Sequence, residues 1–415
     1  MKFGPHIKLF EFADIPMIGN ADTGDVIGLS DKGLDLCQRI EDGRTSIDEA
    51  AREQPDLFEH LEMGGFLAEP YPRSLEAAYL HITQRCNLHC IGCYSDGPDR
   101  NRSTDLSLSA IDDIIAQLAS MGVRTLNISG GEPFLRKDLP LIAQLASRAH
   151  GIPEINILTN GTIYAQNTID GIAPFVKKVS VSFDGISSSD EALVRGSQRF
   201  DELVSFVKLL QKANIPVVLT ATVHRRNIEI LDEYVRLANR LGATMNYSLL
   251  SPPSHGMSEF EDLAFRDDDL VQAATVLWDL ADKGLATVAE EEPVGVGLRC
   301  RDTCGAGARV VSVGADGTLF PCHMMHDDRF ALGNLLEKSL EEILASSKSE
   351  SVSLTTSQLN GCKGCDALPF CAGGCRARSV ASGNGIAGKD AYCAMHKAYY
   401  NEAARRLKAA LEDRS

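Results

Sequence analysis

The chain has 415 residues, of which 44% are hydrophobic, and its formal net charge at pH 7 is −16. This length allows two or three domains, and the apolar content is enough for sizeable cores. The surplus of negative charge repels the phosphates of nucleic acids and anionic lipids, so a nucleic-acid partner is disfavoured. The sequence contains no stretch of about 18 uncharged apolar residues, so no membrane span is predicted.

The first 70 residues are predicted to form a small unit of their own. Its two strand-like segments and three helices are His6–Phe12, Asp25–Leu29, Ser30–Glu41, Ser46–Glu53 and Leu57–Met63. Ser46 and Glu49 have the spacing of a capping box, which supports the start of the second helix. The run Ala68–Arg73 contains two prolines and is typical of a linker. This order of elements predicts a winged-helix-like domain over residues 1–70.

Residues 76–285 alternate strand-like and helix-like segments, as in parallel sheets and barrels. Six strands are predicted at Ala77–Thr83, Thr125–Ser129, Glu154–Thr159, Lys178–Phe183, Val217–Val223 and Thr244–Leu250. Helices with apolar residues at intervals of three and four are predicted at Leu106–Met121, Leu139–Ala149, Phe200–Ala213 and Ile228–Leu241. The pattern predicts an α/β fold, a partial (β/α)6 TIM-like barrel, with chemistry at the C-terminal ends of its strands.

Cys86, Cys90 and Cys93 form a Cys-x3-Cys-x2-Cys triplet directly after the first predicted strand. Three thiolates hold three corners of a [4Fe-4S] cube, which leaves one iron free to bind a substrate or cofactor. Zinc is the alternative, but it needs a fourth ligand, which His89 supplies only awkwardly from within the same loop. With Gly130-Gly131-Glu132-Pro133 after the second strand, the triplet resembles the radical S-adenosylmethionine (SAM) superfamily.

Eight of the 12 cysteines fall between Cys300 and Cys393. The pattern is Cys304-x12-Gly317-x4-Cys322, followed by Cys362-x2-Cys365-x5-Cys371-x3-Cys375-x17-Cys393. It resembles the SPASM extension of radical SAM enzymes, here over residues 298–396, before a helix at 397–415. The resemblance implies two auxiliary [4Fe-4S] clusters, one held by Cys300, Cys304, Cys322 and Cys375, the other by Cys362, Cys365, Cys371 and Cys393.

A disulfide-stapled or zinc-stapled C-terminal domain is the alternative interpretation of these eight cysteines. No signal peptide is recognised, which disfavours secretion and disulfide bonds. Three oxygen-sensitive clusters require a reducing compartment, so a cytoplasmic location is expected.

The resemblance also implies a SAM site at the strand ends. Gly130 and Gly131 would admit the methionine amino group, with Glu132 as a nearby carboxylate and Pro133 closing the run. Arg195 resembles the arginine that binds the methionine carboxylate. Further ribose contacts are expected from Asn160, Ser182 and Asp184, each of which is alternatively a turn or sheet-end residue. The family usually has an aromatic residue immediately before the third cysteine, but Gly92 stands there, so Tyr94 is the candidate adenine contact.

Residues 1–70 resemble the PqqD-like domains that bind leader peptides of ribosomally made, post-translationally modified peptides. Strand addition to the sheet edge is the expected binding mode. Winged helices more often bind DNA, but this segment has more acidic than basic residues. A purely structural cap on the barrel is the other alternative.

The resemblance implies that SAM, reduced at the triplet's cluster, yields a 5′-deoxyadenosyl radical that abstracts hydrogen from a precursor peptide. The electron donor is expected to be a flavodoxin or ferredoxin. His323, with Asp327 behind it, is the candidate base, and its alternative is a polar residue packed beside a cluster. Radical SAM peptide epimerases commonly need a free cysteine in the core, but only Cys37, in the N-terminal unit, remains outside the clusters. The resemblance therefore favours oxidative cross-linking through a thioether or carbon–carbon bond over epimerisation. A non-peptide substrate such as a haem-pathway tetrapyrrole and a non-catalytic iron–sulfur scaffold are the remaining alternatives.

Overall fold

A computed structural model describes residues 2–71, 74–96, 100–196, 199–252, 260–285 and 298–413. The chain divides into two compact units, each built from separate stretches of sequence. One contains Met1–Pro72, Pro293–Cys304 and Leu354–Ser415, and the other contains Arg73–Glu292 and Gly305–Ser353. Pro72 and Arg73, at the end of the predicted linker, lie outside the described residues. Among the described residues, no helix is long and apolar enough to cross a membrane.

The second unit is built on a nine-stranded sheet with the order β12-β11-β10-β4-β5-β6-β7-β8-β9. Its strands are β4 (Ala77–His81), β5 (Thr125–Ser129), β6 (Glu154–Thr159), β7 (Lys178–Phe183), β8 (Val217–Val223), β9 (Thr244–Leu249), β10 (Val310–Val313), β11 (Thr318–Phe320) and β12 (Gly333–Asn334). Strands β4 to β9 are parallel and correspond to the six predicted strands. The predicted α/β class with a partial barrel is therefore confirmed. Strand β10 extends the sheet in parallel beside β4, and β11 and β12 complete it in antiparallel fashion.

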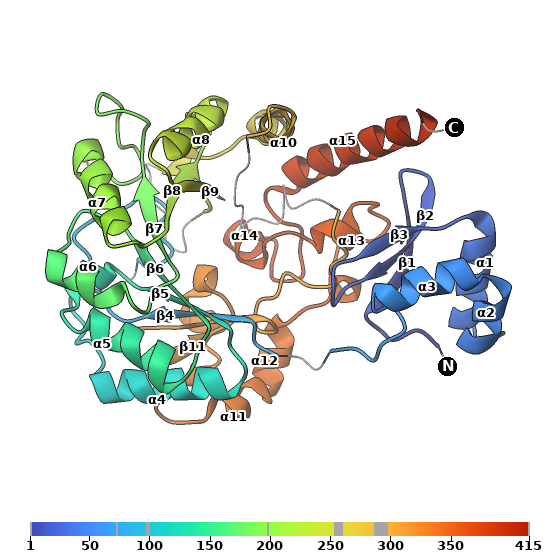
Figure 1. The fold of residues 1–415 in the computed structure, drawn as a ribbon, viewed down its shortest axis with the longest axis horizontal. Helices are drawn as coiled ribbons and strands as arrows, with labels where there is room; N and C mark the ends of the chain where they lie inside the picture. The colour runs from blue at the N-terminus through green and yellow to red at the C-terminus, as the bar shows by residue number, and fades with distance from the viewer. Residues whose placement is uncertain are drawn as a thin grey trace. The chain divides into compact units, whose positions relative to one another are not determined.

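Helices connect the parallel strands and lie along one side of the sheet (Figure 1). They are α4 (Leu108–Ser120), α5 (Leu139–Gln144), α6 (Gln166–Ile172), α7 (Phe200–Lys212), α8 (Leu231–Arg240), α9 (Phe260–Leu263) and α10 (Asp267–Asp282). The helix predicted at Leu139–Ala149 continues from α5 as a π-helical turn, η2 (Leu145–Ala149). The helix predicted from Ile228 begins with a 3-10 turn, η3 (Ile228–Ile230). Short segments after β5 and β11 are η1 (Pro133–Leu135), η4 (His323–Met325), η5 (Asp328–Phe330), α11 (Leu340–Leu344) and α12 (Ser347–Val352).

The first unit begins with a three-stranded antiparallel sheet in the order β1-β2-β3, followed by three helices. These elements are β1 (Ile7–Phe12), β2 (Ile15–Asn20), β3 (Val26–Gly28), α1 (Asp31–Glu41), α2 (Ile47–Glu53) and α3 (Pro55–Met63). Strand β2 was absent from the sequence prediction. It follows a tight turn in which Ala13 and Asp14 both have a φ of 58°. Side chains rarely adopt this conformation, so neither residue signals a hairpin.

The helices α1 to α3 cover one face of this small sheet. Ile18 of β2 is buried against Leu36 and Ile40 of α1 and Leu61 of α3. The capping box predicted at Ser46 forms as expected, with Glu49 as its partner. The unit is completed by η6 (Thr356–Gln358), α13 (Leu368–Cys371), α14 (Arg376–Ala381) and α15 (Cys393–Glu412).

Candidate iron–sulfur and SAM sites

The loop that carries Cys86, Cys90 and Cys93 is attached by its backbone to the end of β5. The Gly131 N–H donates to the Thr83 carbonyl at 2.8 Å, and the Glu132 N–H donates to the Arg85 carbonyl at 2.8 Å. A Cβ at Gly130 would lie 2.4 Å from the Thr83 oxygen, and one at Gly131 would lie 2.2 Å from the Arg85 oxygen. Both positions therefore require glycine. The two glycines were expected to make room for the methionine of SAM, and in the structure they make room for the backbone of the cysteine loop.

Glu132 is completely buried at the end of β5. Its carboxylate accepts hydrogen bonds from the Thr159 hydroxyl at 2.7 Å, the Asn160 N–H at 2.8 Å and the Phe134 N–H at 3.0 Å. Burial raises the pKa of Glu132 to about 7, although these three donors favour the charged form. The carboxylate thus joins the ends of β5 and β6, and its expected role as a nearby acceptor for SAM stays a prediction. Pro133, also buried, starts η1 directly after it.

The three cysteines of this loop lie within electrostatic reach of one another. Burial raises the pKa of Cys90 to about 12, with further contributions from the charges of Cys93 and Cys86, while Arg195 acts in the opposite direction. Such a thiol needs a cation to become a thiolate, as iron would provide. Arg100 Nη1 lies 3.7 Å from Cys93 Sγ, and Asn160 Nδ2 lies 3.8 Å from Cys86 Sγ. These residues and their donors fit an iron–sulfur cluster held by the triplet.

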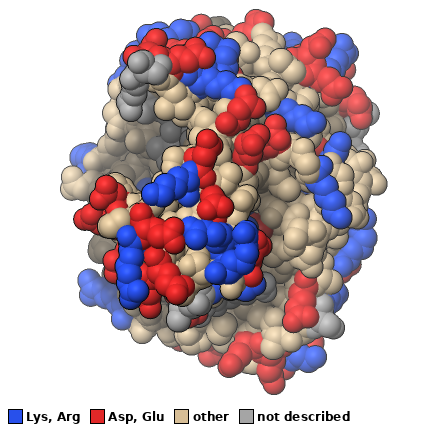
Figure 2. Space-filling model, turned by 90° about the vertical axis from the view of Figure 1, so that its right-hand side faces the viewer, with Lys and Arg blue, Asp and Glu red and all other residues tan. Residues whose placement is uncertain are grey.

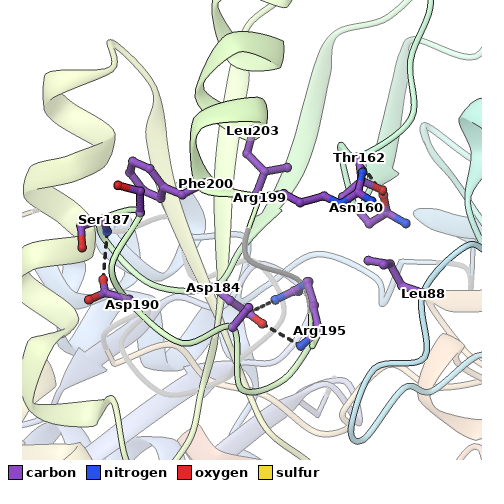
Figure 3. A pocket seen from close by; sticks show the side chains of 12 residues that line it. Leu88, Asn160, Thr162, Asp184, Ser187, Asp190, Arg195, Arg199, Phe200 and Leu203 are labelled. Carbon is purple, nitrogen blue, oxygen red and sulfur yellow. Dashed lines mark hydrogen bonds and ion pairs between the residues drawn. The ribbon is translucent and has the colours of Figure 1, made fainter.

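A cavity that is partly open to solvent lies beside this loop. Asn160, Asp184 and Arg195, three of the predicted SAM contacts, line it together with Leu88 of the cysteine loop. Asp184 and Arg195 face each other across the loop after β7 (Figure 3). The Asp184 carboxylate accepts hydrogen bonds from the Arg195 side chain and, at 2.7 Å, from its backbone N–H. The charged and polar groups of this lining suit the carboxylate and hydroxyl groups of SAM.

Other predicted SAM residues lie outside the lining of this cavity. Ser182 is on β7, in register with Thr220 of β8. The Tyr94 hydroxyl is 3.2 Å from Ser129 Oγ at the end of β5, so the tyrosine reaches the sheet. Gly92 has a φ of 69°, and a Cβ there would lie 2.8 Å from Leu250 Cδ1. An aromatic residue at position 92 would therefore need Leu250 to move and would have to adopt a left-handed backbone conformation. The adenine contact stays a prediction.

Several contributors to the site were missed by the sequence analysis. Thr162, Ser187, Asp190 and Arg199 also line the cavity. Arg100 is buried, donates to Asp96 at 3.0 Å and also bonds the Leu88 carbonyl. The pattern around the cysteines gave no signal for Arg100, because an isolated arginine is usually a solvated surface residue.

The face of the large sheet opposite the helices is polar. Tyr79 is paired with Asn127, Asn127 with Asn156, and Thr220 with Asn246 in neighbouring strands. Residues between them, such as Leu126 and Ile157, are buried and apolar. Within the described residues, Asn156 Oδ1 and Thr220 Oγ1 are buried without a hydrogen-bond partner. Unpaired buried polar atoms are costly, so this wall suits a substrate with polar groups.

His323 lies in a stack of rings at this polar face. Its ring stacks on Tyr79 with centroids 4.0 Å apart, and His326 stacks on His81 at 4.1 Å. Burial lowers the pKa of His323 to about 4, so the imidazole is neutral at pH 7 but a weaker base than expected. Asp327 instead binds Arg329, with contacts of 2.7 and 2.8 Å. The catalytic roles of His323 and Asp327 stay predictions.

The four cysteines assigned to the second auxiliary cluster lie near one another. Burial, followed by the charges of Cys371, Cys365 and Cys362, raises the pKa of Cys393. Cys393 is the first residue of α15, and Cys371 is the last of α13. This arrangement fits a cluster that joins two helices.

A buried carboxylate organises the same region. Asp390 accepts hydrogen bonds from the Cys375 N–H at 2.7 Å, the Tyr392 N–H at 3.0 Å and the Arg378 guanidinium at 3.0 Å. His396 Nε2 lies 3.2 Å from the same carboxylate. Burial would raise the pKa of Asp390, but Arg378 and His396 hold it well below its usual range. The sequence analysis did not predict this residue.

The cysteines assigned to the first auxiliary cluster are divided between the units. Cys300, Cys304 and Cys375 belong to the first unit, and Cys322 belongs to the second. Cys300 is 1% exposed, and burial raises the pKa of its thiol to about 12, with Lys8 and Asp302 the charged neighbours. Cys300 therefore lies beside the N-terminal sheet, and its role as a ligand stays a prediction.

Within the described residues, no group of three or more His, Cys, Asp or Glu side chains is arranged to hold a single metal ion. Thiolates around a cube bind different irons and need not converge on one point.

Comparison with known proteins identifies the family. Residues 80–238 match the radical SAM superfamily, and residues 304–366 match the SPASM iron–sulfur cluster-binding domain. The mycofactocin maturase MftC of Mycobacterium tuberculosis (strain CDC 1551 / Oshkosh) is 30% identical over 79% of this chain and 85% of its own length. The AdoMet-dependent heme synthase of Methanosarcina barkeri is 25% identical over 75% of this chain and 94% of its own length.

Two solved structures share the fold. The enzyme anSMEcpe with bound AdoMet superposes with a TM-score of 0.67 at 16% identity, covering 82% of this chain and 100% of the other. Streptococcus suis SuiB bound to its precursor peptide SuiA gives a TM-score of 0.60 at 14% identity, covering 94% of this chain and 99% of the other. The chain therefore belongs to the radical SAM superfamily and carries a SPASM domain. It is a radical SAM enzyme related to peptide-modifying maturases.

Proposed function

We propose that this enzyme oxidatively modifies a ribosomally made precursor peptide and forms a thioether or carbon–carbon cross-link in it. The observation that carries the proposal is the N-terminal sheet, in which β3 is an edge strand beside β2. The similarity to MftC, a maturase, supports the same conclusion. The proposal includes SAM, one [4Fe-4S] cluster at Cys86, Cys90 and Cys93, and two auxiliary clusters.

When bound, SAM and the clusters would supply one-electron chemistry. A peptide carbon would lose a hydrogen atom to the 5′-deoxyadenosyl group, and one electron would leave for a cluster and one proton for a base as the new bond formed. The residues of the chain would bind and orient SAM and the substrate. Arg195 has donors left for the methionine carboxylate beyond those used by Asp184, because a guanidinium has five N–H groups. The polar wall containing Asn127 and Asn156 faces the substrate. An external flavodoxin or ferredoxin is the proposed reductant.

Among the described residues β3 has a strand partner on one side only, and its other edge suits addition of a peptide strand. Asn20 donates to the Asp25 carbonyl at 2.8 Å, and Leu29 donates to the Pro16 carbonyl at 2.7 Å, so residues 25 and 29 bond to β2. Alternate residues of an antiparallel strand point the other way, which directs the backbone groups of Val26 and Gly28 outward. A leader would pair with these groups.

The charges near this sheet do not favour DNA. On the face shown in Figure 2, lysine and arginine side chains lie among aspartate and glutamate side chains. In the N-terminal helices, Arg39 pairs with Glu53 at 2.6 Å, and Arg44 pairs with Asp42 at 2.6 Å. Such mixing leaves little local positive field for phosphates.

A tetrapyrrole is the second candidate substrate, favoured by the similarity to the AdoMet-dependent heme synthase. In that case the β3 edge would have no peptide to bind. The two functions therefore differ in whether the enzyme binds a leader peptide. This binding can be measured without knowing the product.

The test uses the full-length, anaerobically reconstituted enzyme and a fluorescent peptide encoded by a short reading frame beside the gene. The change Val26→Pro removes one outward N–H from the edge, where proline is tolerated, and Val26→Ala keeps that N–H. Val26→Pro should weaken peptide binding by up to about tenfold relative to Val26→Ala, the worth of one hydrogen bond. SAM cleavage without peptide should be unchanged. Equal binding by both variants, or no binding by the parent enzyme, would favour the tetrapyrrole function.

A further inference from the structure

The face of the N-terminal sheet that the helices leave free is covered by chain segments that carry predicted cluster ligands. Lys8 on β1 pairs with Asp302 at 3.1 Å. The rings of Phe10 and Phe12 contact Phe370, the neighbour of Cys371, with centroids 5.4 and 4.8 Å apart. The small sheet is therefore a layer shared between the N-terminal helices and the iron–sulfur region of the same unit.

Cys300 makes the closest approach to this face. Its N–H donates to the Gly24 carbonyl at 2.9 Å, and the preceding Arg299 donates to the Thr23 carbonyl at 2.7 Å. A Cβ on Gly19 of β2 would lie 2.6 Å from Cys300 Sγ and 2.8 Å from Cys300 Cβ. Any residue larger than glycine at position 19 would therefore displace the Cys300 side chain.

Gly19 also connects Cys300 with the edge proposed to bind the leader. Its partner across the ladder is Val26 of β3, one of the residues whose backbone groups point outward. Only strands β3 and β2 would thus lie between Cys300 and a peptide paired with Val26.

We propose that the N-terminal sheet forms part of the first auxiliary-cluster site, with Gly19 as a positioning residue for Cys300, and that leader binding at β3 is coupled to this cluster. The inference rests on the proposed function for the leader and on Cys300 as a ligand. It adds a role for residues 1–70 beyond holding a peptide. Because coupling is reciprocal, the leader must change the reduction midpoint of the cluster to the extent that reduction changes leader affinity.

The first experiment needs no peptide. In a background carrying Cys86→Ala, Cys90→Ala and Cys93→Ala, only auxiliary clusters contribute iron and electron paramagnetic resonance signals. Gly19→Ala should remove or shift one of the two signals. Gly28→Ala is the matched control, because its Cβ would meet only Ile15 Cγ2 at 3.7 Å.

Lys8→Gln provides a second variant if Gly19→Ala does not fold. It removes an ion pair without adding bulk and should shift the same signal by less. Cys300→Ala should lose that signal. The proposal is overturned if Gly19→Ala and Lys8→Gln both keep the parent spectrum, or if Cys300→Ala retains all its iron.

The second experiment adds the fluorescent peptide to the parent holoenzyme and follows the midpoint potential of each auxiliary cluster. The potential of one cluster should shift on binding, and peptide affinity should differ between oxidised and reduced enzyme by the corresponding factor. Binding without any shift would overturn the coupling and leave the proposed function intact. Failure of the peptide to bind would overturn the proposed function and the coupling, while the Gly19 experiment would still decide the role of the sheet.

Discussion

Two buried carboxylates organise two cysteine sites of this enzyme, and their surroundings shift their pKa values in opposite directions. Glu132 is held by three neutral donors beside the Cys86–Cys93 loop, and burial raises its pKa to about 7. Asp390 is held by Arg378 and His396 beside the C-terminal cysteines, and its pKa lies well below its usual range. Hydrogen bonds alone do not offset burial of a carboxylate, whereas a buried cation does.

The difference follows from how each site is assembled. The triplet lies within one short loop that is fixed by backbone contacts with β5, and Arg100 and Arg195 act on its thiols individually. The C-terminal cysteines are distributed from Cys362 to Cys393 and are joined through a charged network. Asp390 links the backbone of Cys375 with His396. Burial would raise the pKa of the Cys371 thiol, but the charge and the hydrogen bond of His396 outweigh burial and lower this pKa.

The largest expected effect tests whether the two sites are independent. Replacing Cys86, Cys90 and Cys93 together by alanine should abolish SAM cleavage, because the iron that binds SAM is lost. Iron should fall from about twelve to about eight per chain, with the C-terminal clusters retained. Iron analysis and quantification of 5′-deoxyadenosine measure both effects. Unchanged iron would contradict the assignment of the triplet.

A buried histidine extends the comparison. His323 is neutral and stacks on Tyr79. His323→Phe preserves a stacking ring and removes the nitrogen atoms. If the imidazole accepts the substrate proton, product should fall by about 10²–10⁴-fold while 5′-deoxyadenosine persists. His323→Ala, which also loses the stacking, is the comparison variant. A parallel loss of both products in the phenylalanine variant would indicate a packing role.

A smaller effect is expected from neutralising the carboxylate of Asp390. Asp390→Asn leaves Arg378 and His396 without their buried partner, which costs about 3–5 kcal/mol. We expect a lower urea midpoint under anaerobic conditions and loss of about four irons from the C-terminal set. Glu402 provides a surface control, since it pairs with Arg405 and Arg406 at 2.6 and 2.7 Å. Glu402→Gln should cost about 1 kcal/mol or less, and an equal cost for Asp390→Asn would contradict the structural role of the network.

The parallel strands and the local cysteine loop could be predicted because their signals are local. Alternation between apolar strands and amphipathic helices gave β4 to β9 within two residues. The pairing of β10 with β4 was not predicted, because it joins segments more than two hundred residues apart. The spacing of Cys86, Cys90 and Cys93 indicated a common site because three residues in a short loop cannot lie far apart.

The buried polar partners could not be predicted in the same way. Asp390 stands in a run of small and polar residues, and a charged residue there is normally solvated. Its partners are identified only by the packing of α14 and α15. The contact between Gly19 and Cys300 is similarly non-local, and the two prolines near residue 70 point only to a linker. The sequence therefore predicted which residues carry the chemistry more readily than which residues position them.

The smallest expected effect is on the pH dependence of the unfolding free energy, which distinguishes Glu132 from Asp390. The pKa of Glu132 rises from an ordinary value near 4.5 in the unfolded chain to about 7 in the folded one, so the folded state binds more protons between these values. Its contribution to stability is therefore complete below about pH 4.5 and is lost as the pH rises towards 7, with a slope approaching about 1.4 kcal/mol per pH unit. Glu132→Gln should flatten the pH dependence of the unfolding free energy between pH 5 and 7. The exposed Glu154→Gln on β6 is the matched control for loss of a carboxylate. A parent enzyme whose stability increases over this range, with no difference between the two variants, would show that the three donors keep Glu132 charged and that the two cysteine sites rely on the same kind of anchor.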